Sequence, residues 1–234
     1  MDSGEVPSCI GNFAQLTDLY LYGTNKLSGS ISKSTNLKDL YLHYNHLNGT
    51  VELRMFLKLG NLTELHLTAN ELTVLNDQVD NQNATLPKFN LLRLGNKSEG
   101  EIPNLIGNLK RLQSLNLSHN ALTGSIPSLV ENMTQLESLD LSHNQLSGQI
   151  PQQHSQLDFL AVFNISYNNL SGPMPQDNQF NNVDNSSYAG NVGLCGDPLS
   201  KKCGDLKPPS TGSNEGEDEG YDLPIGWTVL IGYG

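Results

Sequence analysis

Histidine, cysteine and carboxylate side chains are the usual components of a catalytic site, and this chain of 234 residues has six His, three Cys and 24 Asp+Glu. Their spacing matches no common catalytic signature. There is no phosphate-binding loop, no G-x-S-x-G elbow, no H-E-x-x-H metal motif and no dinucleotide fingerprint. We therefore expect a protein that is not an enzyme and that carries no cofactor or metal.

The balance of charge restricts the classes of partner. Lys+Arg number 13 against 24 Asp+Glu, which gives a formal net charge of −11. A protein that follows phosphates needs a basic face, and this chain has no surplus of positive charge from which to build one. We expect no nucleic-acid partner.

Nine Asn-x-Ser/Thr sequons could carry N-linked glycans. Such a number is consistent with a secreted, glycosylated ectodomain, although an Asn- and Ser-rich chain also produces some sequons by chance. The predicted glycosylation sites are Asn48, Asn61, Asn83, Asn96, Asn116, Asn132, Asn164, Asn169 and Asn185.

A repeat of about 24 residues positions these side chains. Leu112, Leu115 and Leu117 precede Asn120 in one unit, and the same pattern recurs from Leu136 and from Leu160. Earlier units begin at Leu16, Leu37, Leu62 and Phe89. Leucines at positions 1, 4 and 6 point inward around a short strand, and the Asn at position 9 can bond unpaired backbone where the chain turns. The pattern predicts an α/β leucine-rich-repeat solenoid, a horseshoe with short parallel strands on its concave face.

Two groups of outward side chains on these strands are candidates for binding. The first is a possible ligand face of aromatic residues in the first three units, namely Tyr20, Tyr22, Tyr41, His43, Tyr44 and His66. The second is a partner-binding stripe on the last three strands, namely Asn116, Ser118, His119, Asp140, Ser142, His143, Ser166 and Tyr167. Aromatic clusters on a concave solenoid surface are suitable binding anchors, but both groups could also be ordinary solvated surface.

The last third of the chain supports a family resemblance. Repeats that end in the form of Gly124-Ser-Ile126-Pro127 are followed by Tyr188-Ala-Gly-Asn191, a pair of cysteines, an acidic run and an apolar end from Leu223. This order resembles the plant leucine-rich-repeat receptor-like proteins, which lack a kinase and include disease-resistance receptors. The chain is similar to the C-terminal part of their ectodomain.

The resemblance implies a division of the chain into four parts. Residues 1–175 are expected to form about seven repeats, the first one partial, with an irregular loop at 76–88. A C-terminal cap follows at 176–204, then an acidic disordered spacer at 205–222, and the start of a truncated transmembrane helix at 223–234. No signal peptide is recognisable in the first residues.

A disulfide between Cys195 and Cys203 is expected to secure the cap, because the last coil of a stacked array needs its apolar face covered. The two residues lie eight positions apart, which suits one local bridge, whereas a metal site would need further ligands nearby. Cys9 has no partner in sequence and is expected to be a small buried residue.

The resemblance also implies a function. We expect a cell-surface protein of the plasma membrane, with its repeats on the extracellular side, that acts in plant defence signalling. Its partners would be a protein or peptide ligand and a membrane receptor kinase or co-receptor. Two alternatives remain: a soluble leucine-rich-repeat inhibitor of a microbial cell-wall hydrolase, and a truncated product without activity.

Overall fold

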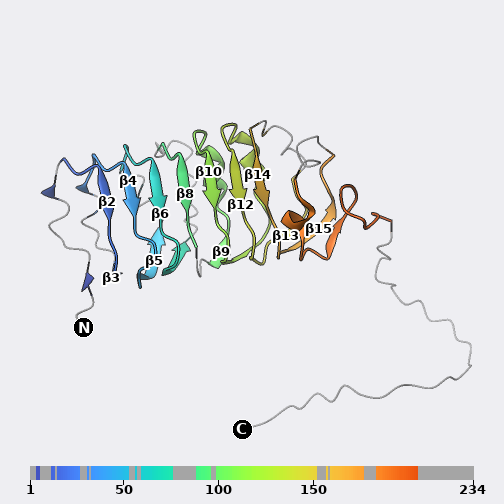
Figure 1. Cartoon of the computed structure of the whole chain (residues 1–234), viewed down its shortest axis with the longest axis horizontal. Helices are drawn as coiled ribbons and strands as arrows, with labels where there is room; N and C mark the ends of the chain where they lie inside the picture. Colours follow the sequence, from blue (N-terminus) through green and yellow to red (C-terminus); the bar gives the residue numbers. More distant parts are fainter. Residues whose placement is uncertain are drawn as a thin grey trace, which may run out of the picture. The chain divides into compact units, whose positions relative to one another are not determined.

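A computed structural model describes residues 4–5, 12–13, 15–26, 31, 33–52, 56, 59–75, 88–95, 99–151, 157, 159–176 and 183–204. Residues Met1–Cys203 form one unit of the chain, and Gly204–Gly234 form a second. The first unit is a solenoid of short parallel strands (Figure 1). The predicted leucine-rich-repeat architecture is thereby confirmed. Cys9, the acidic spacer and the proposed membrane helix lie outside the described residues, as does the irregular loop except for Lys88.

Seven three-residue strands form the main sheet, one from each predicted repeat. Each strand is parallel to its neighbours, and its central Leu or Phe is buried while the residues on either side face outward. In spatial order the strands are β2 (Asp18–Tyr20), β4 (Asp39–Tyr41), β6 (Glu64–His66), β8 (Leu91–Arg93), β10 (Ser114–Asn116), β12 (Ser138–Asp140) and β14 (Val162–Asn164). We call their outward surface the strand face.

Further along each coil the chain forms smaller parallel sheets of two or three strands. These strands are β1 (Gly4–Glu5), β3 (Thr24–Lys26), β5 (Asn48–Glu52), β7 (Glu71–Leu75), β9 (Glu99–Glu101), β11 (Ala121–Thr123), β13 (Ser147–Gly148), β15 (Asn169–Pro173) and β16 (Gly193–Cys195). The 3₁₀ helices η3 (Asn104–Asn108) and η4 (Ser128–Asn132) follow Pro103 and Pro127, and η7 (Asn185–Tyr188) follows Asp184. These tight helices return the chain to the next strand.

The repeated leucines make one continuous hydrophobic core. Leu40, Leu65, Leu92, Leu115 and Leu139 stack from coil to coil and are almost completely buried. Burying an aliphatic side chain of this size contributes roughly 1.5–3 kcal/mol. Because each coil covers the apolar face of its neighbour, the core extends along the solenoid and positions the strand face at a fixed spacing.

The repeated asparagines bond the backbone of the turn, as the sequence predicts. Nδ2 of Asn144 donates to the carbonyl of Leu141 at 3.0 Å and to that of Leu117, in the preceding coil, at 2.9 Å. Its Oδ1 accepts from the backbone N–H of Leu122 at 3.1 Å. One amide therefore joins its own turn to the coil before it. Equivalent bonds are made by Asn45, Asn70, Asn120 and Asn168.

The structure adds a coil that the repeat pattern does not predict. Asn191 donates to the carbonyls of Tyr188 and Ile165, both at 3.0 Å, and accepts from the N–H of Leu170. The strand that follows, β16, pairs with β15. The segment expected to be only a cap thus continues the ladder of asparagines for one more turn.

Candidate binding surfaces

The predicted ligand face is a contiguous aromatic cluster on β2, β4 and β6 and the turns after them. Tyr20 stacks on Tyr41 with ring centroids 4.5 Å apart, and Tyr41 lies 4.3 Å from His66. His43 joins the second layer, with Tyr22 at 5.7 Å and Tyr44 at 5.4 Å. The register of the parallel strands brings these rings together because equivalent positions lie side by side in successive coils. We call the six residues the N-terminal aromatic cluster.

Burial and neighbouring positive groups keep His66 neutral. Burial lowers its pKa to about 4, and the neighbouring Arg93 and His43 act in the same direction. Within the described residues, Nε2 of His66 and Nδ1 of His43 are buried and have no hydrogen-bond partner. The hydroxyl of Tyr41 donates to Glu64, and burial together with that bond raises the pKa of Tyr41 far above its ordinary value.

A row of carboxylates beside the aromatic cluster was missed by sequence reasoning. Asp18, Asp39 and Glu64 are opposite one another in the register of β2, β4 and β6. Each precedes an aromatic residue by two positions, so the period of a strand places both on the same face. That spacing was the signal available in the sequence.

Hydroxyl groups and a second carboxyl group surround these acids. Thr17 donates to Asp18 at 2.6 Å, and Thr63 donates to Asp39 at 3.1 Å. The bonds from Thr17 and Asp39 lower the pKa of Asp18, whereas burial and the bond with Asp18 raise the pKa of Asp39. The strand register places the two carboxyl groups side by side at the surface.

The predicted partner-binding stripe contains an aromatic stack in the turns that follow β10, β12 and β14. The rings of His119 and His143 are stacked at 4.3 Å, and Tyr167 stacks on His143 at 4.5 Å. All three residues have φ near +55°, as do Tyr44 and Ala69 at the same position of earlier coils. The stack ends at Gly190, where an added Cβ would come within 2.8 Å of the Tyr167 ring.

The polar members of the stripe divide into exposed and buried groups. Asn116 and Asp140 are half-buried and are joined by a hydrogen bond of 3.3 Å. Ser142 and Ser166 were expected to face outward, and this is wrong: they are 3% and 5% exposed.

The cause is a local bond that recurs in each coil. The hydroxyl of Ser142 donates to Asp140, that of Ser166 to Asn164, and that of Ser118 to Asn116. Each serine also donates its backbone N–H to the same oxygen, so the side chain folds back against the turn. Asn116, Ser118, His119, Asp140, His143 and Tyr167 remain accessible to different degrees.

The sequons differ in exposure. Asn116 and Asn164 are half-buried on the strand face, and Asn83 and Asn96 lie outside the described residues. The exposed sequon asparagines are Asn48, Asn61, Asn132, Asn169 and Asn185.

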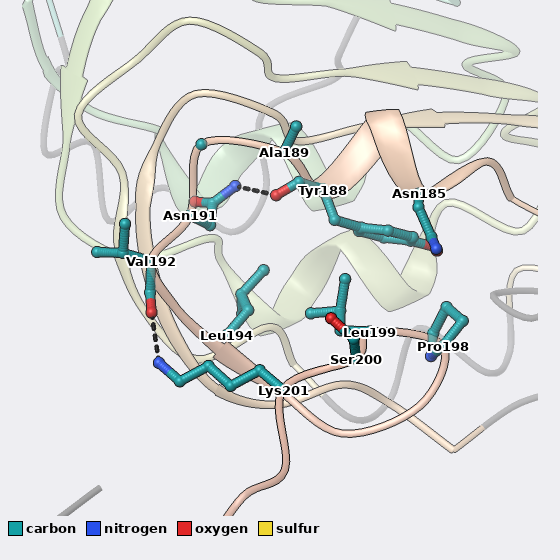
Figure 2. A pocket seen from close by; sticks show the side chains of 11 residues that line it. Asn185, Tyr188, Ala189, Asn191, Val192, Leu194, Pro198, Leu199, Ser200 and Lys201 are labelled. Atoms are coloured by element: carbon teal, nitrogen blue, oxygen red, sulfur yellow. Dashed lines mark hydrogen bonds between the residues drawn. The ribbon is translucent and has the colours of Figure 1, made fainter. Parts of the chain in front are cut away.

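The C-terminal cap contains a pocket that sequence reasoning did not find. Cys195 and Cys203 form the expected disulfide, and the loop between them lines one side of an open pocket of about 450 Å³ next to the last coil. Figure 2 shows Tyr188, Leu194 and Leu199 lining it. Burial raises the pKa of Tyr188 to about 12. Nζ of Lys201 donates to the Val192 carbonyl at 2.6 Å, so the one ammonium group in the lining is already bonded.

Two further properties concern the described part of the chain only. Within it, no group of three or more His, Cys, Asp or Glu side chains could hold a metal ion. Nor does that part contain a helix whose length and hydropathy would suit a membrane span.

Comparison with known proteins gives the fold a context. Residues 110–153 match the family model described as leucine rich repeats (2 copies). Over 59 residues, or 24% of this chain, the sequence is 49% identical to Receptor-like protein 9DC3 of Solanum pimpinellifolium. The matched segment spans 7% of that relative's length.

Solved plant ectodomains have the same architecture. The ectodomain of the receptor kinase GASSHO1/SCHENGEN3 from Arabidopsis thaliana, in complex with CASPARIAN STRIP INTEGRITY FACTOR 2, is similar at a TM-score of 0.72 and 36% identity. The match covers 85% of this chain and 24% of that one. The Arabidopsis receptor kinase HAESA, in complex with the peptide hormone IDA and the co-receptor SERK1, is similar at a TM-score of 0.66 and 28% identity, covering 86% of this chain and 33% of that one.

Proposed function

We propose that this chain is the membrane-proximal repeat region of a plant receptor-like protein that binds other proteins and catalyses no reaction. It lies on the outer side of the plasma membrane and signals in defence by pairing with a membrane receptor kinase. The leucine-rich-repeat fold and the similarity to plant ectodomains that bind peptides and co-receptors support this function.

The observation that carries the proposal is the exposed stack of His119, His143 and Tyr167 in the turns after the last three strands. Tyr167 is 55% exposed, and both histidines are exposed. Rigid, stacked rings cost little conformational entropy when a partner covers them, and aromatic side chains commonly dominate interface energies. Asp140 ends β12 three residues before His143 and supplies a charged group for orienting the partner.

The cap and the sequons support a place outside the cell. A disulfide persists in an oxidising compartment, and five of the described sequons have exposed asparagines that a glycosyltransferase could reach. The N-terminal aromatic cluster, on the opposite end of the strand face from the stack, is left for a protein or peptide ligand.

The test is capture of a receptor kinase from leaf membranes by the full chain expressed there with an affinity tag. We expect the wild type to retain a membrane receptor kinase after mild cross-linking. The triple variant His119→Ala/Asp140→Arg/His143→Ala should retain at least about tenfold less, since it removes two rings and reverses one charge at the contact. A glycosidase treatment of the same material should increase the mobility of the chain on a gel.

A control variant carries the same reversal of charge on another surface. Glu131→Arg alters the charge on η4, away from the strand face, and should leave the capture unchanged. Equal capture by the triple variant would show that the stack is not the contact. Failure of the wild type to retain any receptor kinase would contradict the function itself.

A further inference from the structure

The open pocket in the C-terminal cap has the size of a small-molecule site. Its volume is about 450 Å³, within the range of roughly 300–1,000 Å³ that is common for such sites. All of its lining comes from residues 185–201, so one short stretch of chain forms it. Leu194 is a buried member of the lining, and Pro198, Leu199 and Ser200 belong to the disulfide loop. We call this space the cap pocket.

The lining of the cap pocket favours a neutral ligand. It contains no carboxylate, and its one ammonium group, that of Lys201, already donates to the carbonyl of Val192. The amide of Asn191 is also engaged, since it bonds backbone groups of its own turn and of the preceding coil. Ser200 contributes an exposed hydroxyl group beside the apolar side chain of Leu199. Apolar surface with a few polar groups suits a sugar ring, which has C–H faces and hydroxyl groups at its edge.

Asn185, an exposed residue of the lining, is itself an acceptor for a sugar. It begins η7 and is the asparagine of the sequon Asn185-Ser186-Ser187. Figure 2 shows its side chain pointing from η7 towards the side of the pocket where Pro198 lies. A glycan on this nitrogen would therefore begin at the cap pocket and not in open solvent.

The other sequons lack this arrangement. Of the nine sequon asparagines, Asn185 is the one that belongs to the lining of the cap pocket. Asn169 is exposed on β15, outside that lining. Asn116 and Asn164 are half-buried, and Oδ1 of each accepts bonds from the serine two residues later. The exposed Asn169 therefore provides a comparison for a glycan without a pocket.

We propose that the cap pocket holds the innermost N-acetylglucosamine of a glycan attached to Asn185. In the transfer, Nδ2 of Asn185 forms a bond to C1 of the sugar, the bond from C1 to the diphosphate of a lipid-linked donor breaks, and Nδ2 loses one proton. The ring and its acetamido methyl group pack against the apolar side chains of Leu194 and Leu199. The inference rests on the extracellular location in the proposed function, and it assigns a ligand to this pocket.

The covalent link makes a weak contact sufficient. A ligand on a short tether has an effective concentration in the millimolar range or above, so the pocket is filled even where free sugar binds poorly. The sugar lies against the loop that the disulfide of Cys195 and Cys203 closes. Because it contacts the folded cap and not the opened one, it should make local opening of the cap less frequent.

The test is hydrogen exchange of the full chain, secreted from plant cells with an added leader peptide. An endoglycosidase trims each occupied sequon to one N-acetylglucosamine, and the mass of the glycopeptide establishes that Asn185 carries it. Ser187→Ala gives the chain without this sugar, because it removes the sequon and keeps Asn185. We expect the bonded amides of Leu194, Gly196 and Leu199 to exchange about fivefold faster in this variant than in the wild type.

Three controls isolate the sugar and the pocket. In chains made without glycans in an oxidising bacterial compartment, Ser187→Ala should change these exchange rates by less than about twofold. Ser171→Ala removes the sequon of Asn169 from an exposed position of β15 and should leave the rates of the cap unchanged. Ser200→Trp places a large side chain in the pocket, and in that background the loss of the sugar should have no effect.

The inference is overturned by an unmodified Asn185 or by equal exchange with and without the sugar. It is also overturned if Ser171→Ala, or Ser187→Ala without glycans, gives the same acceleration, or if the acceleration persists with Ser200→Trp. Each of these outcomes can occur while the chain still captures a receptor kinase, and in that case only the ligand of the pocket is wrong. Loss of capture while the sugar still slows exchange would instead contradict the proposed function.

Discussion

His66 is a half-buried titratable group within the N-terminal aromatic cluster. The groups that face it are Glu64 on its own strand, Tyr41 on β4, His43 in the turn after β4, and Arg93 on β8. Burial, Arg93 and His43 disfavour the imidazolium, and Glu64 opposes them more weakly. The imidazole is therefore held neutral by its surroundings, and the folded chain resists its protonation.

This resistance predicts a loss of stability in mild acid. The pKa of His66 is about 4 in the folded chain and 6.5 in its ordinary state, so the unfolded chain binds this proton first. The contribution of His66 to the free energy of unfolding is constant above pH 6.5, and that free energy falls as the pH decreases from 6.5 towards 4. We expect the thermal midpoint to fall more across this window in the wild type than in His66→Gln.

Comparison of the two proteins at each pH cancels the effect of the other titrating groups. His46→Gln is the control, because His46 is an exposed histidine in the turn after β4. The thermal midpoint of His46→Gln should change with pH in the same way as that of the wild type between pH 6.5 and 4. Identical curves for the wild type and His66→Gln would contradict the predicted depression of the His66 pKa.

At the scale of one coil, the asparagine in the turn is the most constrained polar residue. Nδ2 of Asn168 donates to the carbonyls of Leu141, Ile165 and Ser166, and its Oδ1 accepts from the N–H of Leu146 at 3.0 Å. The side chain is 8% exposed. Removing it would leave the buried N–H of Leu146 without a partner, whereas the carbonyls of Leu141 and Ile165 would keep their bonds from the amides of Asn144 and Asn191.

The variant Asn168→Ala should therefore lower the free energy of unfolding by about 1–3 kcal/mol, which is the cost of one buried N–H group that loses its partner. The neighbouring Asn169→Ala provides the control, because Asn169 is exposed on β15 and should change stability by less than about 0.5 kcal/mol. Urea denaturation of unglycosylated protein measures both. Similar losses for the two variants would mean that the ladder of asparagines does not hold the turn.

The coil also shows what sequence can predict. The inward leucines and the turn asparagines follow from periodicity and from the need to pair buried backbone groups, and the structure confirms both. The burial of Ser142 and Ser166 did not follow, because periodicity places a residue on a face but does not fix its rotamer. The coil that contains Asn191 was not predicted, because Tyr188 occupies the position where the other coils have an aliphatic residue.

The surfaces could be predicted less completely than the fold. Strand register was sufficient to bring the N-terminal aromatic cluster and the His119–His143 pair together. The cap pocket depends on the path of the loop between Cys195 and Cys203, which no repeat dictates. The function of each surface depends on the partner that binds there, and the repeat pattern does not encode that partner. The chain spans a minor part of the length of the proteins that it matches.

At the scale of the solenoid, stability is local, because each coil contacts only its neighbours. The last repeat that the sequence pattern predicts is covered by the additional coil of η7 and β16 and by the disulfide loop. A bridge that closes a loop of this length contributes about 2–3 kcal/mol. That contribution should act on the terminal coil far more than on the centre of the array.

Hydrogen exchange can measure this difference. In Cys195→Ser/Cys203→Ser, amides of β16 and of the turn at Asn191 should exchange faster by a factor that corresponds to about 2–3 kcal/mol. Amides of β10 and β12 should keep their protection. Reduction of the wild type provides a second route to the same state, and exchange that accelerates equally throughout would contradict local stability.

The left-handed turn residues limit how these binding surfaces can diversify. Tyr44, His119, His143 and Tyr167 have φ between 53° and 56°, a conformation that β-branched residues strongly resist. Valine, isoleucine and threonine are therefore poor replacements at the position that displays the stacked rings. Duplication of a coil would thus supply a new recognition position at which few residue types are tolerated. New partners would be acquired by exchanging glycine, asparagine, histidine or tyrosine at that position. Variation in the strand positions, where the backbone is extended, has no such restriction.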